Sequence, residues 1–194
     1  MKNESNFATK QYQSVPNLVP LDICKFATQA LIFSEADYVT KHGMIKNGDS
    51  QVPGSQSFYG NPVTEALLVM VLPKIEEIVE DKLLPTYSYA RIYRNNAILK
   101  LHRDRPSCEV SVSIQLASVG VQNQGGWAIS MDGKNIHLSD SDGVVYNGIK
   151  VEHGRDELVC EETGFQAQVF LHYVRASGRF ARFCFDRRIG LGIS

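Results

Sequence analysis

Three side chains in this sequence have the types that could bind one metal ion together. His102 and Asp104 are separated by a single residue, and His153 follows further along the chain. Two imidazoles and one carboxylate on one face of a metal form the facial triad of non-haem Fe(II) sites, which leaves coordination positions open for a co-substrate and for dioxygen. His102, Asp104 and His153 therefore predict an iron centre that carries out oxygen chemistry.

The backbone around the first two ligands is predicted to be extended. Residues i and i+2 of a strand point to the same face, so His102 and Asp104 reach one metal only from an extended segment. Residues 86–93 and 109–116, on either side, are rich in aromatic and β-branched side chains in rough alternation, which is typical of strands. The alternative is that His102 and Asp104 stand at a strand end and make only solvent-facing hydrogen bonds.

The composition is that of an ordinary globular chain. Its 194 residues carry a formal net charge of -1, which gives no electrostatic footprint for nucleic acid or an anionic membrane. The four cysteines are scattered, which is typical of reduced thiols. There is no basic-then-apolar leader and no apolar run near the ~18 residues of a membrane span. We expect one domain over residues 1–194 in a cytoplasmic protein, with no nucleic-acid and no membrane partner.

The first third of the chain predicts two helices. Residues 1–19 are polar and predict a loose arm or an edge strand, and apolar spacing then predicts a helix over 21–33. Residues 42–60 are rich in Gly, Ser, Gln and Pro and predict a loop bordering a site. Asn61 and Pro62 are a cap and a first-turn proline for a second helix to about residue 82, in which Pro73 predicts a kink or two shorter helices.

From residue 84 onward the sequence predicts strand after strand, with turns at the Gly-Gly and Asp-Gly pairs. The predicted strands cover residues 86–93, 109–116, 127–131, 134–138, 143–146, 166–174 and 180–185. The fold class is α+β and mainly β: a double-stranded β-helix, or jelly roll, over residues 84–194, backed by a helical support region and loop over residues 1–83.

Four features in order resemble the prolyl 4-hydroxylase-like branch of the Fe(II)/2-oxoglutarate-dependent dioxygenases, from about residue 67 to the end. They are Tyr93 upstream of the His-x-Asp pair, the Gly125-Gly126 turn, the segment 142–146 and the distal His153. The resemblance implies Fe(II) on His102, Asp104 and His153, with 2-oxoglutarate and O2 as co-substrates and ascorbate as an optional reductant. It also implies that the Tyr93 hydroxyl points toward the co-substrate; the alternative is a core tyrosine.

One position departs from this family. Members carry an Arg or Lys in the strand after the distal histidine, where it pairs with the far carboxylate of 2-oxoglutarate, whereas residues 161–164 here are Glu-Glu-Thr-Gly. A guanidinium is the natural partner of a carboxylate in a dry pocket. We therefore consider Arg155 first, then Arg182 on the last predicted strand, and Gln166 or Gln168 with help from another group. Each arginine taken alone is better explained as a surface charge.

Other residues near the predicted centre have two interpretations each. Arg105 follows the ligand Asp104 and is a candidate substrate contact or a loop charge, and Trp127 follows the Gly-Gly turn and is a candidate substrate contact or core packing. His172 is a rival metal ligand or, as its apolar neighbours favour, a buried strand histidine. Ser111 and Ser113 line a wet cavity or face solvent.

The resemblance implies hydroxylation of a C–H bond, because the related halogenases lack the carboxylate ligand that Asp104 supplies here. A prolyl residue in a peptide or protein is the first substrate expected, with residues 42–60 as a lid over a peptide, and small-molecule substrates remain open. The alternative function is a cupin-like jelly roll that binds a metal or a small ligand without 2-oxoglutarate turnover. A cupin usually shows His-x-His and an additional Glu, which residues 102–104 lack.

Overall fold

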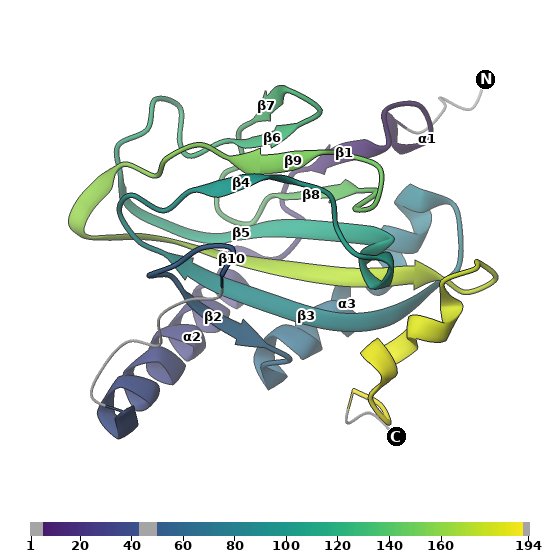
Figure 1. The fold of residues 1–194 in the computed structure, drawn as a ribbon, viewed down its shortest axis with the longest axis horizontal. Helices are drawn as coiled ribbons and strands as arrows, with labels where there is room; N and C mark the ends of the chain where they lie inside the picture. The colour runs from purple at the N-terminus through teal and green to yellow at the C-terminus, as the bar shows by residue number, and fades with distance from the viewer. Residues whose placement is uncertain (1–5, 43–49, 192–194) are drawn as a thin grey trace.

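Two antiparallel sheets form the body of the protein in the computed structural model, which describes residues 6–42 and 50–191 (Figure 1). The larger sheet has the order β1 (Tyr12–Val15), β8 (Gly143–Tyr146), β5 (Val110–Val121), β10 (Cys160–Arg175), β3 (Leu83–Tyr93) and β2 (Gln56–Tyr59). The smaller sheet has the order β4 (Leu99–His102), β9 (His153–Arg155), β6 (Ile129–Met131) and β7 (Lys134–Ile136). This arrangement confirms the predicted jelly roll.

Helices cover the outer face of the larger sheet. After the short α1 (Asn6–Lys10), α2 (Leu21–His42) and α3 (Pro62–Val79) cross beneath it in Figure 1. Leu31 and Leu68 are fully buried in a core that they share with Ile114 of β5. Asn61 caps α3 as predicted, since its side-chain oxygen accepts a hydrogen bond from the Val63 amide at 3.0 Å. The helical layer therefore holds the larger sheet as a rigid wall.

The interior between the sheets contains two smaller apolar clusters. One joins Tyr93 and Phe170 of the larger sheet to Leu99 of β4, and the other joins Tyr146 of β8 to Met131 of β6. These contacts fix the separation of the sheets, because close-packed side chains leave little room for the sheets to shift. Polar groups placed between the same sheets are consequently held in defined positions.

Several boundaries differ from the sequence expectations. The helix predicted over 21–33 continues to His42, and α3 is one helix rather than two, since Pro73 lies on its exposed face where solvent satisfies the freed carbonyl. Strands β1 and β2 precede residue 84, so the segment 1–83 adds both edge strands of the larger sheet. Part of the predicted loop 42–60, residues 43–49, lies outside the described residues.

The strand predicted over residues 180–185 is wrong. This segment belongs to the 3-10 helical segment η2 (Ala181–Arg187), which packs against β3 and β10 without pairing to them. Its alternation of aromatic and basic residues arises from stacking, because Arg179 lies over the Phe180 ring and Arg182 over the Phe183 ring. These aromatic and basic side chains therefore contact one another and do not form the two opposite faces of a strand.

All four cysteines are free thiols, as the sequence suggested. Among the described residues, no helix combines the length and the apolar character that crossing a membrane requires.

Candidate metal centre

The pairing of two short strands brings the three predicted ligands together. β4 and β9 are antiparallel neighbours in which His102 lies opposite His153, and the two imidazole centroids are 4.3 Å apart. Asp104 follows β4, and its Oδ1 lies 3.8 Å from His102 Nε2 and 3.6 Å from His153 Nε2. One donor atom from each residue lies within 4.8 Å of the others, so the set fits a single metal ion.

Close contact between these strands depends on glycine. A Cβ atom on Gly154, between the two paired positions of β9, would lie 2.6 Å from the Leu99 carbonyl oxygen and 2.9 Å from the Leu101 amide nitrogen. Both distances are far below normal van der Waals contact. Gly154 therefore permits the approach that places His102 beside His153.

Each imidazole is oriented by the backbone. His102 Nδ1 lies 2.8 Å from the Lys100 carbonyl oxygen, and His153 Nδ1 lies 3.0 Å from the Val151 carbonyl oxygen. A carbonyl only accepts hydrogen bonds, so Nδ1 carries the proton in both rings and each Nε2 offers a lone pair. Gln51 already uses the lone pair of His102, since its amide nitrogen lies 3.0 Å from Nε2, and a metal ion would replace this contact.

Charge in the centre also suits a cation. Burial lowers the pKa of His102 below its ordinary value, and the neighbouring His153 lowers it further. Burial alone would raise the pKa of the Asp104 carboxyl, but the neighbouring His153 and His172 and the hydrogen bond from Ser111 lower it below its ordinary value of 3.8. A neutral His102 imidazole beside an ionised Asp104 carboxylate is the combination of protonation states that metal coordination needs.

The second oxygen of Asp104 is fixed by residues that the sequence did not single out as its partners. Oδ2 accepts a hydrogen bond from Ser111 at 2.9 Å. A Cβ on Gly148 would lie 2.5 Å from the same oxygen and 2.3 Å from the Cys108 carbonyl oxygen, so only glycine fits there. Nothing in the sequence pattern marks Gly148. Ser111 and Ser113 are both fully buried, which resolves their two interpretations in favour of the interior.

His172 contacts Ser111, the residue that donates a hydrogen bond to Asp104. Its Nδ1 lies 2.9 Å from Ser111 Oγ, and its ring lies 4.6 Å from the Tyr87 ring. Burial lowers the pKa of His172 to about 4, so the ring is neutral. Asp104, Cys108 and His172 also lie within metal-binding distance of one another, but burial raises the pKa of the Cys108 thiol to about 12 and disfavours the thiolate that a metal requires.

A cavity of ≈ 350 Å³ opens above the three predicted ligands. Its walls include the aromatic side chains Tyr87, Tyr89, Tyr146 and Phe170. Arg91, Arg103 and Arg105 are its basic lining residues, and Asp104 is the only acidic one among the described residues. Arg103 and Arg105 are paired with Glu152 and Asp186, so an anionic ligand that binds either guanidinium would compete with a carboxylate of the protein.

Arg155 lies in the interior near the centre. It is 3% exposed, it donates a hydrogen bond to the Trp127 carbonyl oxygen, and its guanidinium lies 4.8 Å from the Trp127 ring centroid. With its amide oriented to satisfy its neighbours, Gln168 accepts from Arg155 at 3.2 Å and from Gln166 at 2.7 Å. Burial lowers the Arg155 pKa to about 10, and no carboxylate of the described residues pairs with it.

The remaining predicted residues fall into two groups. Tyr93 is fully buried, and its hydroxyl accepts a hydrogen bond from Arg91 at 3.2 Å. Trp127 is 3% exposed beside Tyr93 and lines a second cavity of ≈ 310 Å³ that Arg155 shares, rather than the cavity above the metal ligands. Arg105 lines the cavity above the ligands, whereas Arg182 is exposed and lines neither cavity.

Arg91 is a cavity residue that sequence reasoning missed as a candidate. Its side chain is 1% exposed and lies between the Tyr89 and Tyr93 hydroxyls, and it donates to Gln51 at 3.3 Å. The signal was present, because Tyr89, Arg91 and Tyr93 share one face of a predicted strand. An arginine on that face indicates a polar interior.

Comparison with known proteins bears on the fold. No family model matches the sequence, and no curated protein matches it. Solved structures do match: a prolyl-4-hydroxylase from Pseudomonas putida is 16% identical with a TM-score of 0.60, covering 88% of this chain and 96% of that one. HygX from Streptomyces hygroscopicus, solved with nickel, 2-oxoglutarate and hygromycin B bound, is 12% identical with a TM-score of 0.65, covering 91% and 88%.

A third similar structure widens the range of reactions found on this fold. SnoN, a non-haem α-ketoglutarate-dependent epimerase from nogalamycin biosynthesis, is 12% identical with a TM-score of 0.64, covering 97% of this chain and 88% of that one. Two of these proteins are named for different reactions, one as a prolyl-4-hydroxylase and one as an epimerase. The likeness therefore establishes the fold of this chain, and its chemistry has to be argued from its own residues.

Proposed function

We propose that this chain, which has the fold of the Fe(II)/2-oxoglutarate-dependent dioxygenases, is itself such an enzyme, with His102, Asp104 and His153 as its iron ligands. One observation carries the proposal: both Nε2 atoms and Asp104 Oδ1 converge, and backbone carbonyls hold each imidazole in the tautomer that binds a metal. When bound, iron and 2-oxoglutarate supply the oxidising power, with dioxygen consumed, succinate and CO2 released, and a substrate C–H bond hydroxylated.

We place the far carboxylate of 2-oxoglutarate at Arg155, with Tyr93 and Gln168 as its neutral neighbours. A guanidinium this deeply buried is costly without an anion, and its pKa is lowered to about 10 by that burial. Arg155 also lies two residues after His153 on one strand, so both side chains emerge on the same face. Arg182 is withdrawn from this role because it is exposed and lies off the strands.

A prolyl residue in a peptide or protein is our first candidate substrate. The Pseudomonas putida prolyl-4-hydroxylase and a viral collagen prolyl hydroxylase, at a TM-score of 0.61, support this choice, and HygX and SnoN support testing small molecules as well. The cavity opens to the surface beside exposed Arg103 and Arg105, which allows a long substrate to extend beyond it. The residues of this chain then orient the substrate and exclude water.

Anaerobic titration with Fe(II), with and without 2-oxoglutarate, tests the proposal. A weak visible charge-transfer band is expected when the keto acid chelates facial-triad iron. The band should disappear in His102→Gln and His153→Gln and persist in His42→Gln, an exposed histidine at the end of α2. Iron that binds without producing the band would reject the 2-oxoglutarate assignment and favour the cupin-like alternative.

A further inference from the structure

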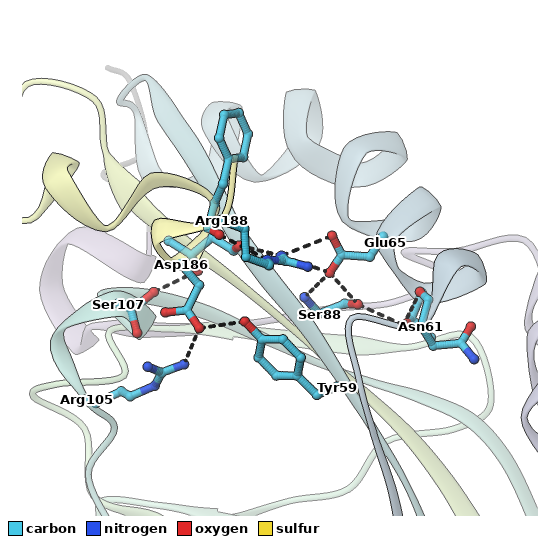
Figure 2. A network of polar contacts seen from close by, with 11 residues as sticks. Tyr59, Asn61, Glu65, Ser88, Arg105, Ser107, Asp186 and Arg188 are labelled. Carbon is cyan, nitrogen blue, oxygen red and sulfur yellow. Dashed lines mark hydrogen bonds and ion pairs between the residues drawn. The ribbon is translucent and has the colours of Figure 1, made fainter. Parts of the chain in front are cut away.

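The C-terminal segment places the Asp186 carboxylate against Arg105, a residue that lines the cavity (Figure 2). Asp186 Oδ2 accepts a hydrogen bond from Arg105 Nη2 at 2.9 Å and another from the Tyr59 hydroxyl at 2.6 Å. The Asp186 side chain is 12% exposed, whereas that of Arg105 is 52% exposed. The contact therefore covers Asp186 while leaving much of the Arg105 guanidinium accessible.

Arg105 belongs to the cavity as well as to this contact. Its guanidinium lies 4.7 Å from the centroid of the Tyr87 ring, and both residues line the space above the metal ligands. Tyr59 also stacks on Tyr87, since the centroids of the two rings are 5.1 Å apart. Arg105, Tyr59 and Tyr87 thus form a cationic and aromatic recess at the rim, which has the chemistry to bind a carboxylate.

The segment that carries Asp186 has an unfavourable backbone. Phe185, Asp186 and Arg187 have φ values of 54°, 52° and 64°, in the left-handed region that residues other than glycine rarely occupy. Beyond them, Arg188 donates to Glu65 Oε2 at 3.2 Å and to the Thr86 carbonyl oxygen at 2.9 Å (Figure 2). This second attachment holds the segment in place away from the cavity, so Asp186 can leave Arg105 without the segment detaching.

We propose that Arg105, Tyr59 and Tyr87 form a subsite for a carboxylate of the substrate, and that Asp186 occupies this subsite in the free protein. The proposal rests on the proposed dioxygenase function and adds the class of substrate: one that carries a carboxylate, such as a free amino acid, a peptide C-terminus or an acidic side chain. The Arg105 guanidinium, which lines the cavity with a side chain that is 52% exposed, favours such a group.

Substitution of Asp186 tests the subsite in the full-length, metal-free protein, with N-acetylglycine as the carboxylate probe. Asp186→Asn keeps a residue that tolerates left-handed φ but removes the charge that competes for Arg105. We expect N-acetylglycine to bind about tenfold more tightly than to the wild type and to shift the NMR signal of the Arg105 Nε–H group. Glu157→Gln, which removes an exposed charge outside the cavity, should leave the affinity at the wild-type value.

Two further variants make the result decisive. The double variant Asp186→Asn with Arg105→Gln should bind N-acetylglycine no more tightly than the wild type. Arg188→Gln, which loosens the second attachment, should bind it more tightly than the wild type but less tightly than Asp186→Asn. Equal affinities in Asp186→Asn and Glu157→Gln, or a gain that survives loss of Arg105, would overturn the proposal. The N-acetylglycine titration needs no metal, so its result is independent of the charge-transfer band that tests the proposed function. Failure of the subsite proposal would leave that band unchanged, and absence of the band would not alter the measured affinity for N-acetylglycine.

Discussion

Two arginines next to metal ligands in the sequence have opposite electrostatic surroundings. Arg155, two residues after His153, is 3% exposed, has no carboxylate partner among the described residues, and has a pKa lowered by burial. Arg105, directly after Asp104, is half exposed; burial acts to lower its pKa, but Asp186 and Tyr87 raise it above its ordinary value. One charge lacks an anion inside the protein, and the other already has one.

This difference separates a position built for a ligand from one that the protein fills for itself. Burying an unpaired charge destabilises a fold, so such a charge indicates an anion that arrives with binding. An ion pair whose cation is half exposed contributes less to stability than a fully buried one, and its cation remains accessible to a ligand. We therefore assign the co-substrate to the interior arginine and the substrate to the arginine at the rim.

The largest expected effect comes from removing a ligand of the metal centre, next to which both arginines lie in the sequence. Asp104→Ala should lower Fe(II) affinity by more than about a hundredfold, since even partners outside the coordination shell cost about ten- to a hundredfold. Calorimetric titration and the keto-acid band measure this loss. Adding Asp104→Ala to Asp186→Asn should not change the affinity for N-acetylglycine. If the affinities for Fe(II) and for N-acetylglycine both fell, the metal centre and the Arg105 subsite would not be independent.

The second effect concerns the interior arginine alone. Arg155→Gln should weaken 2-oxoglutarate binding to the iron-loaded protein by about a hundredfold, because one half of a buried charge pair is lost. The free energy of unfolding of the metal-free protein should not fall, since the substitution also removes an unpaired buried charge.

Matched variants decide which arginine holds the co-substrate. Arg105→Gln and Arg182→Gln should leave 2-oxoglutarate affinity within about twofold of the wild type, because Arg105 lies at the rim of the cavity and Arg182 lines neither cavity. A large loss in Arg91→Gln with none in Arg155→Gln would move the far carboxylate to the cavity wall, where Arg91 contacts the Tyr93 hydroxyl.

The sequence predicted the parts of this centre that depend on local pattern. The period-two spacing of His102 and Asp104, the cap at Asn61 and the turns at Asp-Gly pairs each follow from backbone geometry over a few residues. The fold class followed as well, because the order of helices and strands limits the ways to form layers.

What the sequence missed depends on contacts between distant segments. Gly148 is needed because the Asp104 carboxylate and the Cys108 carbonyl occupy the space of a Cβ, and nothing within a few residues of position 148 indicates this. The segment 180–185 alternates like a strand, but no sheet edge accepts it and its rings stack on arginines. The Asp186–Arg105 contact likewise joins two residues that lie 81 positions apart and that local patterns do not relate.

A third effect comes from the histidine that touches both regions, since the Tyr87 ring contacts His172 and Arg105. The pKa of His172 is about 4 in the folded protein, against an ordinary value of 6.5. Below pH 6.5 the unfolded chain takes up a proton that the folded protein does not, so the free energy of unfolding falls as pH decreases from 6.5 toward 4.

Denaturant unfolding of the metal-free protein measures this dependence. Between about pH 7 and about pH 5, the contribution of His172 should amount to about 2 kcal/mol, from about 1.4 kcal/mol per pH unit below the unfolded pKa. His172→Gln should lose this contribution, and His137→Gln should retain the wild-type slope. Equal slopes in all three proteins would mean that His172 is protonated in the folded state.

The smallest expected effect concerns the support of Asp104. Ser111 donates to Asp104 Oδ2 at 2.9 Å and thereby turns Oδ1 toward both imidazoles. Ser111→Ala should lower Fe(II) affinity by about tenfold, at the lower end of the effects of partners outside the coordination shell. Ser113→Ala is the matched control, because Ser113 is equally buried on the same face of β5 but contacts Gln168 in the interior. Equal Fe(II) affinities in the two variants would show that the hydrogen bond from Ser111 does not position the Asp104 carboxylate for metal binding.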